Sequence, residues 1–551
     1  MEKIFGIDLG TTYSCISYVD EFGKAVVLPN NENERTTPSV VFFDEDNVIV
    51  GSVAKESARL YPEQVVSFIK REMGNGEYSF AYNNNTYKPE EISALILKKL
   101  VKDGEEHLGE EIKDVVITCP AYFGINEREA TKVAGEIAGL NVRQVLNEPT
   151  SAAVAYGMGT DEEKTVLVYD LGGGTFDVSM IDIRREEIKV ICTGGDHNLG
   201  GKDFDDRIIY YLQQQFTEQT GISDDILGDL ETSQELQNSA ERAKKILSSR
   251  ELVPVAVNYN GERAKVTLTR DKFEELTSDL VQRTVALTKE MLKEAKEKGY
   301  NSFDEILLVG GSTRMPMVRD AIADEFGIEP RLFDPDEVVA KGAALYGYKL
   351  SVNDEMVKRI SNSTGTNVEE VREAVEEKTI NKDVVEETLK ELASDTGFRL
   401  SAVRATNVKI TNVVSKSFGV VAIDSREKEI VSNLILKNTN VPCEVTKVYG
   451  TNEENQETAL IRIMENEVNE DVIDLDLSRE IGTAELNLPA GLSYNSPIMI
   501  TFKLNEDGRL EIKAWEGQGE NTINSVFETK SVISGEELIE AKERSKNIRV
   551  S

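Results

Sequence analysis

Two segments of this chain repeat one combination of chemical groups. Residues 7–12 (IDLGTT) and 170–175 (DLGGGT) each place an aspartate at the end of an apolar strand, followed by glycine and threonine. Glycine allows a tight turn whose backbone N–H groups point into one concavity, which suits a polyphosphate. The spacing is not that of the GxxxxGK loop, and no helix is expected directly after either turn, which excludes a P-loop. The repetition predicts an internal duplication, with two half-domains facing one cleft.

The side chains of these turns predict a site for magnesium and a nucleotide. Asp8 and Asp170 would hold Mg²⁺ through water molecules, because this ion dehydrates reluctantly. The hydroxyls of Thr11, Thr12 and Thr175 would contact phosphate oxygens. A simpler interpretation is two tight hairpins in which each aspartate accepts from turn amides, and it fits one motif alone better than it fits the pair.

Two further residues suit phosphoryl transfer. Lys70 could neutralise charge on the transferred phosphoryl group, and Glu148 could orient the attacking water. Spacing alone leaves the structural alternatives open. A lysine beside Arg71 is typical of a solvated surface, and a glutamate before Pro149 is typical of a helix cap.

A predicted helix around residues 239–248 carries a polar face. Glu241, Lys244, Lys245 and Ser248 follow at i, i+3, i+4 and i+7, so an acid, two amines and a hydroxyl share one side. This face could bind a ribose and a purine, although an exposed face with an i,i+4 ion pair has the same spacing.

A third glycine turn (GGSTR, 310–314) follows the apolar strand 306–309. Gly310, Gly311 and Arg314 could form the opposite wall of the nucleoside site, where glycine lets the base lie against the backbone.

The composition excludes several classes of function. A length of 551 residues exceeds one hydrophobic core, so two to four domains are expected. The 63 basic and 99 acidic residues give a net charge of −36, which disfavours binding to nucleic acids and anionic membranes. His107 and His197 are the two histidines, too few for a histidine-rich metal site. The four cysteines lie far apart, which favours reduced thiols in a cytoplasmic protein.

The pattern of elements predicts five segments. Residues 1–350 alternate strands and helices, which indicates an α/β domain. Residues 351–403 have helical spacing, 404–415 form a linker, 416–532 contain short alternating strands, and 533–551 form one short helix.

One hairpin within the strand-rich segment is well defined. Phe502 and Leu504 alternate toward a turn at Asp507–Gly508, and Leu510 and Ile512 alternate away from it.

Together these residues resemble the 70-kDa heat-shock protein (DnaK-type) chaperone family. The similar segments, in chain order, are GIDLGTTYS (6–14), PAYF (120–123), NEPT (147–150), DLGGGTFD (170–177), LGG (199–201), GGSTR (310–314) and DPDE (334–337). Any one of them is weak evidence, but the ordered set is specific. The resemblance implies an actin-like, ribonuclease-H-like duplicated ATPase domain, then a helical insert and an all-β sandwich.

The resemblance also implies roles for individual residues. Lys70 resembles the catalytic lysine, with Asp8, Asp170, Glu148 and Thr175 around magnesium and water, and Asp177 resembles a further acid of the site. The positions that resemble nucleotide contacts are Gly10, Thr11, Thr12, Tyr13, Gly172, Gly173, Gly174, Gly200, Gly201, Glu241, Lys244, Lys245, Ser248, Gly310, Gly311, Ser312, Arg314 and Asp336.

The β-rich segment resembles the part of this family that binds extended apolar peptides. LILKNTNVP (434–442) and TNEENQ (451–456) carry the likeness. Strand-face core is the alternative for each position aligned with the peptide cleft, namely Val420, Ile423, Tyr449, Asn452, Ala459 and Ile461. Ala459 stands where a larger aliphatic is usual, and each missing buried CH₂ costs about 0.8 kcal/mol.

Three departures from the family pattern bear on coupling between the domains. The lid over the peptide is nearly absent, which predicts fast peptide release. The linker reads VKITN (408–412), where Lys409 and Asn412 replace an aliphatic residue and an aspartate. Gln144 stands where an arginine usually serves the J-domain partner.

The sequence therefore predicts a cytoplasmic, ATP-dependent molecular chaperone. ATP binding and hydrolysis to ADP would switch the affinity of the β-domain for unfolded or extended polypeptides. A J-domain co-chaperone and a nucleotide exchange factor are candidate partners. Two alternatives stay open: a sugar-kinase-like phosphotransferase, and an uncoupled ATP-binding scaffold with a dedicated partner.

Overall fold

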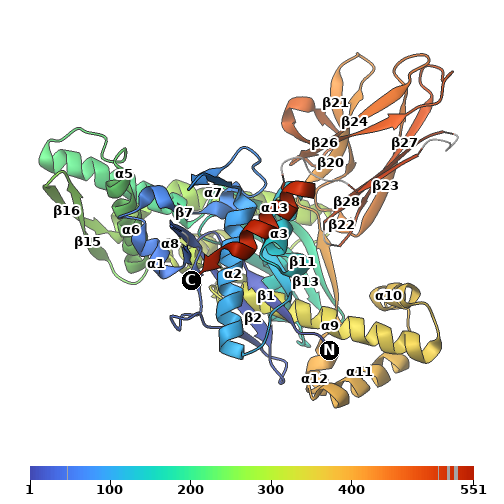
Figure 1. Cartoon of the computed structure of the whole chain (residues 1–551), viewed down its shortest axis with the longest axis horizontal. Coiled ribbons are helices and arrows are strands. Elements are labelled where there is room, and N and C mark those ends of the chain that lie inside the picture. Colours follow the sequence, from blue (N-terminus) through green and yellow to red (C-terminus); the bar gives the residue numbers. More distant parts are fainter. Residues whose placement is uncertain (46, 507, 518–521, 527–531) are drawn as a thin grey trace.

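The computed structural model describes residues 1–45, 47–506, 508–517, 522–526 and 532–551. It has two α/β lobes, a small helical insert and a β-sandwich, which lies at the upper right of Figure 1. None of the helices within the described residues combines the length and apolar composition needed to cross a bilayer.

Lobe I is built on a sheet with the strand order β11-β10-β1-β2-β3, in which β4 also pairs with β2. Strand β1 is parallel to β10 and antiparallel to β2, so the first glycine turn joins two neighbouring strands. These strands are β1 (Ile4–Asp8), β2 (Tyr13–Val19), β3 (Ala25–Leu28), β4 (Thr37–Pro38), β10 (Asp114–Cys119) and β11 (Asn141–Asn147). The outer part of the lobe contains α1 (Ser52–Ser57), α2 (Pro89–Leu108), α3 (Ile125–Ile137), β5 (Val40–Asp44), β6 (Asn47–Val50), β7 (Val65–Ser67), β8 (Phe80–Tyr82) and β9 (Asn85–Tyr87).

Lobe II repeats this arrangement. Its sheet has the order β18-β17-β12-β13-β14-β19-β22, and β12 is parallel to β17 and antiparallel to β13. The strands are β12 (Lys164–Leu171), β13 (Phe176–Arg184), β14 (Glu187–Asp196), β17 (Glu305–Val309) and β18 (Arg331–Leu332). Around them lie α5 (Gly201–Thr220), α6 (Leu230–Leu247), α7 (Arg270–Glu297), α8 (Pro316–Phe326), β15 (Leu252–Tyr259) and β16 (Glu262–Thr269). The predicted duplication is confirmed.

The sequences of the central strands are almost entirely apolar because these strands are buried. Strand β12 is buried along almost its whole length, as expected for a strand covered on both faces. Helices α4 (Glu148–Gly157) and α9 (Val338–Thr364) pack against each other between the lobes. Their shared core includes Val154 and Val339 and continues onto the sheets of both lobes.

The helical insert extends from the end of α9. It contains α10 (Val368–Glu376), α11 (Lys382–Thr396) and α12 (Leu400–Ala405), which bury apolar residues against α9. The side chains of Asn367 and Asn381 cap the first two of these helices by accepting N–H groups at 2.8 Å.

The chain then returns to lobe II. Strand β19 (Lys409–Val413) lies parallel to β14, and β22 (Asn440–Val441) of the following domain pairs with it antiparallel. The sheet of lobe II thus continues through the linker into the β-sandwich.

The β-sandwich consists of two antiparallel sheets around one apolar core. The sheets are β25-β21-β20-β24-β26 and β23-β27-β28-β29. Their strands are β20 (Ser417–Ile423), β21 (Glu429–Ile435), β23 (Cys443–Gly450), β24 (Thr458–Asn466), β25 (Val472–Asp474), β26 (Ser478–Asn487), β27 (Pro497–Leu504), β28 (Leu510–Glu516) and β29 (Thr522–Val526). The predicted pairing of β27 with β28 is confirmed, although Asp507 of its turn lies outside the described residues.

The C-terminal segment lies on lobe I. Helix α13 (Gly535–Asn547) packs against α2 and α3, and β30 (Arg549–Val550) adds a parallel strand to β6 (Figure 1). The short helix predicted within residues 533–551 is therefore present, and its packing partners are in lobe I.

Candidate nucleotide site

A cavity of about 620 Å³ lies between the two lobes. The three glycine turns and the polar face of α6 all contribute to its wall. The predicted residues that line it are Asp8, Gly10, Thr11, Thr12, Tyr13, Lys70, Glu148, Asp170, Gly172, Gly173, Thr175, Gly201, Glu241, Lys244, Lys245, Ser248, Gly310, Gly311, Ser312, Arg314 and Asp336. Residues far apart in the sequence therefore converge on one space.

The two repeated turns meet directly. A Cβ atom at Gly173 would lie 2.2 Å from Thr12 Oγ1, and one at Gly174 would lie 2.4 Å from Thr11 Cγ2. A side chain at either position would have to displace the facing threonine, so the close approach of the two turns favours glycine.

Backbone hydrogen bonds hold the second turn on the start of α5. The N–H of Gly201 donates to Gly172 O at 2.9 Å, and that of Lys202 donates to Gly173 O at 2.8 Å. Ser312 Oγ also donates to Gly172 O at 2.8 Å, which ties the third turn to the second.

Lys70 and Glu148 form a buried ion pair at one end of the cavity. Lys70 Nζ lies 2.6 Å from Glu148 Oε1, and both side chains are almost fully buried. Lys70 belongs to a short 3₁₀ turn, Ile69–Glu72, and Glu148 begins α4. Burial lowers the pKa of Lys70, but Glu148 and Asp8 outweigh it, so the pKa is raised and the ammonium stays charged.

The carboxylates around this pair would repel one another if all were charged. Burial, and then Glu148, raise the pKa of Asp8 to about 7, that of Asp177 to about 8, and that of Asp170 well above its ordinary value. A single lysine cannot neutralise four acids, so a divalent cation fits this end of the cavity. Carboxylates are oxygen ligands of the kind that Mg²⁺ prefers, usually together with retained waters, so the acids at this end of the cavity fit that ion.

At the other end, four side chains bridge the lobes. Lys245 Nζ lies 2.7 Å from Glu241 Oε1 and donates to the Tyr13 hydroxyl at 2.9 Å. Lys55 also pairs with Glu241 and donates to the Tyr13 hydroxyl at 3.1 Å. Burial raises the pKa of Glu241, but Lys55 and Lys245 outweigh it and bring the pKa to about 2.

Three predicted residues lie behind the wall. Gly174 O accepts from the Arg71 guanidinium at 2.7 Å, and Gly200 packs on Gly174 so closely that a Cβ would lie 2.5 Å from its backbone. Asp177 is buried and accepts the N–H of Tyr122 at 3.1 Å.

Several wall residues were missed by sequence analysis. Gln237 and Asn238 lie one turn before Glu241 on the same face of α6, so extending the helical spacing backward would have found them. Lys55 reaches the cavity from α1 and Asp205 from α5, and no spacing pattern in the sequence indicated either residue.

The predicted peptide residues divide into two groups. Val420, Ala459 and Ile461 are at least nine-tenths buried in the core between the two β-sheets. The more accessible residues are Ile423, which is 51% exposed, Asn452, and Tyr449, whose hydroxyl donates to Ser432 Oγ at 3.0 Å.

Comparison with known proteins agrees with this architecture. The family model described as "Hsp70 protein" matches residues 4–80 and 75–364. The chain belongs to the Hsp70 family. It is also 36% identical over 555 residues to proteins named "Chaperone protein DnaK" from two strains of Halobacterium salinarum, with 98% of this chain and 77% of each relative covered. As an Hsp70 protein, the chain is an ATP-dependent molecular chaperone with ATPase activity.

Proposed function

We propose that this Hsp70 chain binds Mg²⁺ and ATP between its lobes and hydrolyses ATP to ADP and phosphate. The cycle would change the affinity of the β-sandwich for extended apolar polypeptide segments. The observation that carries the proposal is the contact between the two repeated turns beside the buried Lys70–Glu148 pair, all in one cavity.

The residues of the cavity would have distinct roles in binding and hydrolysis. Asp8 and Asp170 would hold Mg²⁺ through water, and the ion would supply charge neutralisation at the phosphates. Lys70 would neutralise the charge of the transferred phosphoryl group, and Glu148 would orient the attacking water. Because Lys70 and Glu148 are paired at 2.6 Å, a change in either would displace the other.

Two contacts between the ATPase lobes and the β-sandwich support coupling of ATP binding to peptide binding. The linker strand β19 joins the sheet of lobe II to β22 of the sandwich. In addition, Lys416 of the sandwich lies 3.7 Å from the ring centroid of Tyr122, whose N–H donates to Asp177 beside the catalytic pair. A change in charge at the carboxylates would therefore reach the sandwich through a single residue, Tyr122.

The proposed partners are unfolded or extended polypeptides, with a J-domain protein and a nucleotide exchange factor as regulators. Gln144 donates to Glu506 O of the sandwich at 3.2 Å, so the position where the family usually has an arginine contacts the β-domain here. The free thiols of Cys15, Cys119, Cys192 and Cys443 favour a reducing, cytoplasmic location.

An ATPase assay with and without an apolar peptide tests this proposal. We expect Lys70→Ala to bind ATP but to lower turnover by roughly 100-fold or more, because charge stabilisation in the transition state is lost. Lys272→Ala, which removes an exposed lysine on α7, is the matched control. ATP turnover that survives Lys70→Ala, or that ignores peptide in the unmodified chain, would contradict the proposal.

A further inference from the structure

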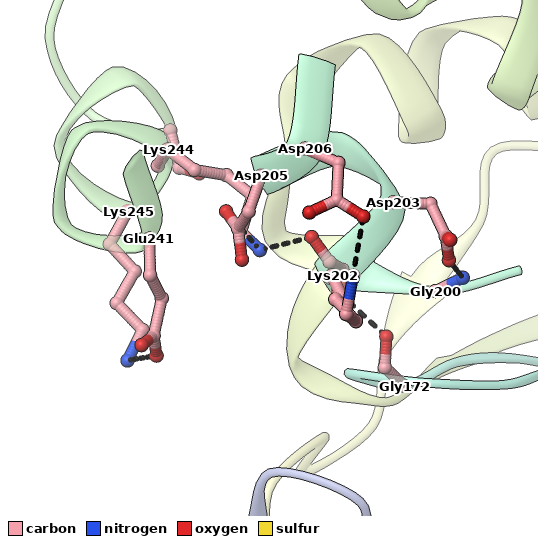
Figure 2. Close-up of polar contacts among 12 residues, drawn as sticks. Gly172, Gly200, Lys202, Asp203, Asp205, Asp206, Glu241, Lys244 and Lys245 are labelled. Atoms are coloured by element: carbon pink, nitrogen blue, oxygen red, sulfur yellow. Dashed lines mark hydrogen bonds and ion pairs between the residues drawn. The ribbon is translucent and has the colours of Figure 1, made fainter. Parts of the chain in front are cut away.

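Asp205 has no role in the function proposed above, yet it lines the same cavity. It lies on the first turns of α5 and is 6% exposed. Its carboxylate lies 2.8 Å from Lys244 Nζ, which reaches across from α6 (Figure 2).

The surroundings of Lys244 leave part of its ammonium for a ligand. The group has three N–H donors. In the described chain Gly201 O accepts one of them at 2.6 Å, and the Asp205 carboxylate lies 2.8 Å from the ammonium as its ion-pair partner. Lys244 lines the cavity, so a further N–H can meet a nucleotide oxygen.

The close fit around Lys244 leaves its ammonium little freedom. A Cβ atom at Gly201 would lie 2.9 Å from Lys244 Nζ and 2.6 Å from Ser312 Oγ. The glycine makes room for the lysine head, and Asp205 holds that head from the other side.

A neighbouring ion pair shows that this arrangement is not a general property of the helix. Lys202 and Asp206 form an ion pair on the same α5 (Figure 2). They lie 2.6 Å apart, but their side chains are 28% and 37% exposed. The side chains of Lys244 and Asp205 are 10% and 8% exposed. Burying a charge pair costs desolvation energy that the attraction between the charges offsets only in part. Stability alone is therefore a weak reason for burying Lys244 and Asp205 together.

We propose that Asp205 is a positioning residue for nucleotide binding that acts through Lys244. Its carboxylate fixes the ammonium so that the free N–H meets an oxygen of the ribose or phosphates. Asp205 itself does not touch the nucleotide. This inference rests on the proposed nucleotide site and adds a residue to it.

The charges facing Asp205 predict that nucleotide affinity depends on pH. Burial raises the pKa of Asp205 to about 6, Lys244 opposes this, and Glu241 and Asp206 add to it. The groups concerned are Lys244 and Glu241 on α6, with Lys202 and Asp206 on its own helix. Protonation below about pH 6 removes the ion pair, so nucleotide affinity that depends on Asp205 falls there.

The test compares ADP binding by calorimetry and steady-state ATP hydrolysis in Asp205→Asn and in the control Asp206→Asn. Because the displaced ammonium would lose one charged hydrogen bond to the nucleotide, Asp205→Asn should bind ADP roughly tenfold more weakly. Its KM for ATP should rise with kcat within about twofold, because the reacting groups are untouched. Asp206→Asn should match the unmodified chain, and the ratio of ADP affinities between Asp206→Asn and Asp205→Asn should fall toward one below pH 6.

A double-mutant cycle isolates the route through Lys244. In a Lys244→Met background, Asp205→Asn should add no further loss of ADP affinity. Additive losses would overturn the inference, as would Asp205→Asn with unmodified affinity or with kcat lowered as much as affinity. If Asp205→Asn does not fold, Asp205→Glu keeps the charge but displaces it, and unmodified ADP affinity there would equally overturn the inference. Failure of the unmodified chain to bind ADP would instead refute the proposed function.

Discussion

At the scale of single residues, burial converts ordinary carboxylates into groups that titrate near neutral pH. Glu90 near the start of α2 is 1% exposed, and burial raises its pKa to about 7. Its own backbone N–H and Lys88 oppose this shift, whereas Glu91 and Glu537 add to it. The folded state therefore holds a proton on Glu90 that the unfolded chain, with a pKa near 4.5, releases earlier.

We expect this proton to appear in the pH dependence of stability. The contribution of Glu90 is fully present below pH 4.5 and is lost as the pH rises to about 7. The difference of about 2.5 pKa units corresponds to an upper bound of roughly 3 kcal/mol. Glu90→Gln should remove this fall, so at pH 8 it should be more stable to urea than the unmodified chain. Glu297→Gln, at an exposed position of α7, is the control, and identical pH profiles for all three chains would contradict the assignment.

At the scale of elements, local spacing predicted what each segment is but not always what it packs against. The apolar run of β12 and the four polar residues of α6 could be predicted because periodicity is a local property. Lys55 and Asp205 could not, since they enter the cavity from elements whose placement depends on tertiary packing. The same limit applies to α13, whose spacing indicates a helix with one apolar face but names no partner.

The partner of α13 is held by specific contacts. The guanidinium of Arg544 donates two hydrogen bonds to Glu91 Oε1, at 2.7 and 3.1 Å, and the Glu91 side chain is 6% exposed. Val550 of β30 is buried in the core of lobe I, and Lys102 donates to its carbonyl at 2.9 Å. The segment is thus a structural part of the ATPase lobe.

Disrupting these contacts should destabilise lobe I. Arg544→Ala removes the cation from the buried Glu91 carboxylate, which keeps only the Lys88 N–H at 3.1 Å, so we expect a loss of about 3 kcal/mol in the free energy of unfolding. Val550→Ala should cost about 1–2 kcal/mol through lost burial. Lys546→Ala removes an exposed pair with Glu543 and should cost little. Urea unfolding measures all three, and Arg544→Ala as stable as Lys546→Ala would show that the segment is not integral to the lobe.

At the scale of the whole molecule, the β-sandwich touches the ATPase lobes through charged residues set among buried ones. Glu465 on β24 is 5% exposed and accepts the N–H of Ile125 at 3.1 Å. Lys416 at the start of the sandwich is 8% exposed, pairs with Glu467 at 2.6 Å and covers the ring of Tyr122. A desolvated cation over an aromatic face is worth about 2 kcal/mol, enough to bias docking of the two domains.

Lys416→Met should therefore weaken communication between the domains while sparing each site. Methionine keeps the length and apolar contact of the lysine stem but loses the charge, so docking of the sandwich against Tyr122 should weaken by about 1–2 kcal/mol. Trp515, the one tryptophan of the chain, lies on β28 and reports on the sandwich. We expect the change in Trp515 fluorescence on adding ATP, and the stimulation of ATPase by an apolar peptide, to fall several-fold in Lys416→Met. ADP affinity should stay unchanged, because Lys416 lies outside the cavity wall.

Lys428→Met, which removes an exposed pair with Asp474 in the same domain, is the matched control. Equal responses in both variants would mean that the signal passes through the β19–β22 pairing rather than through Tyr122.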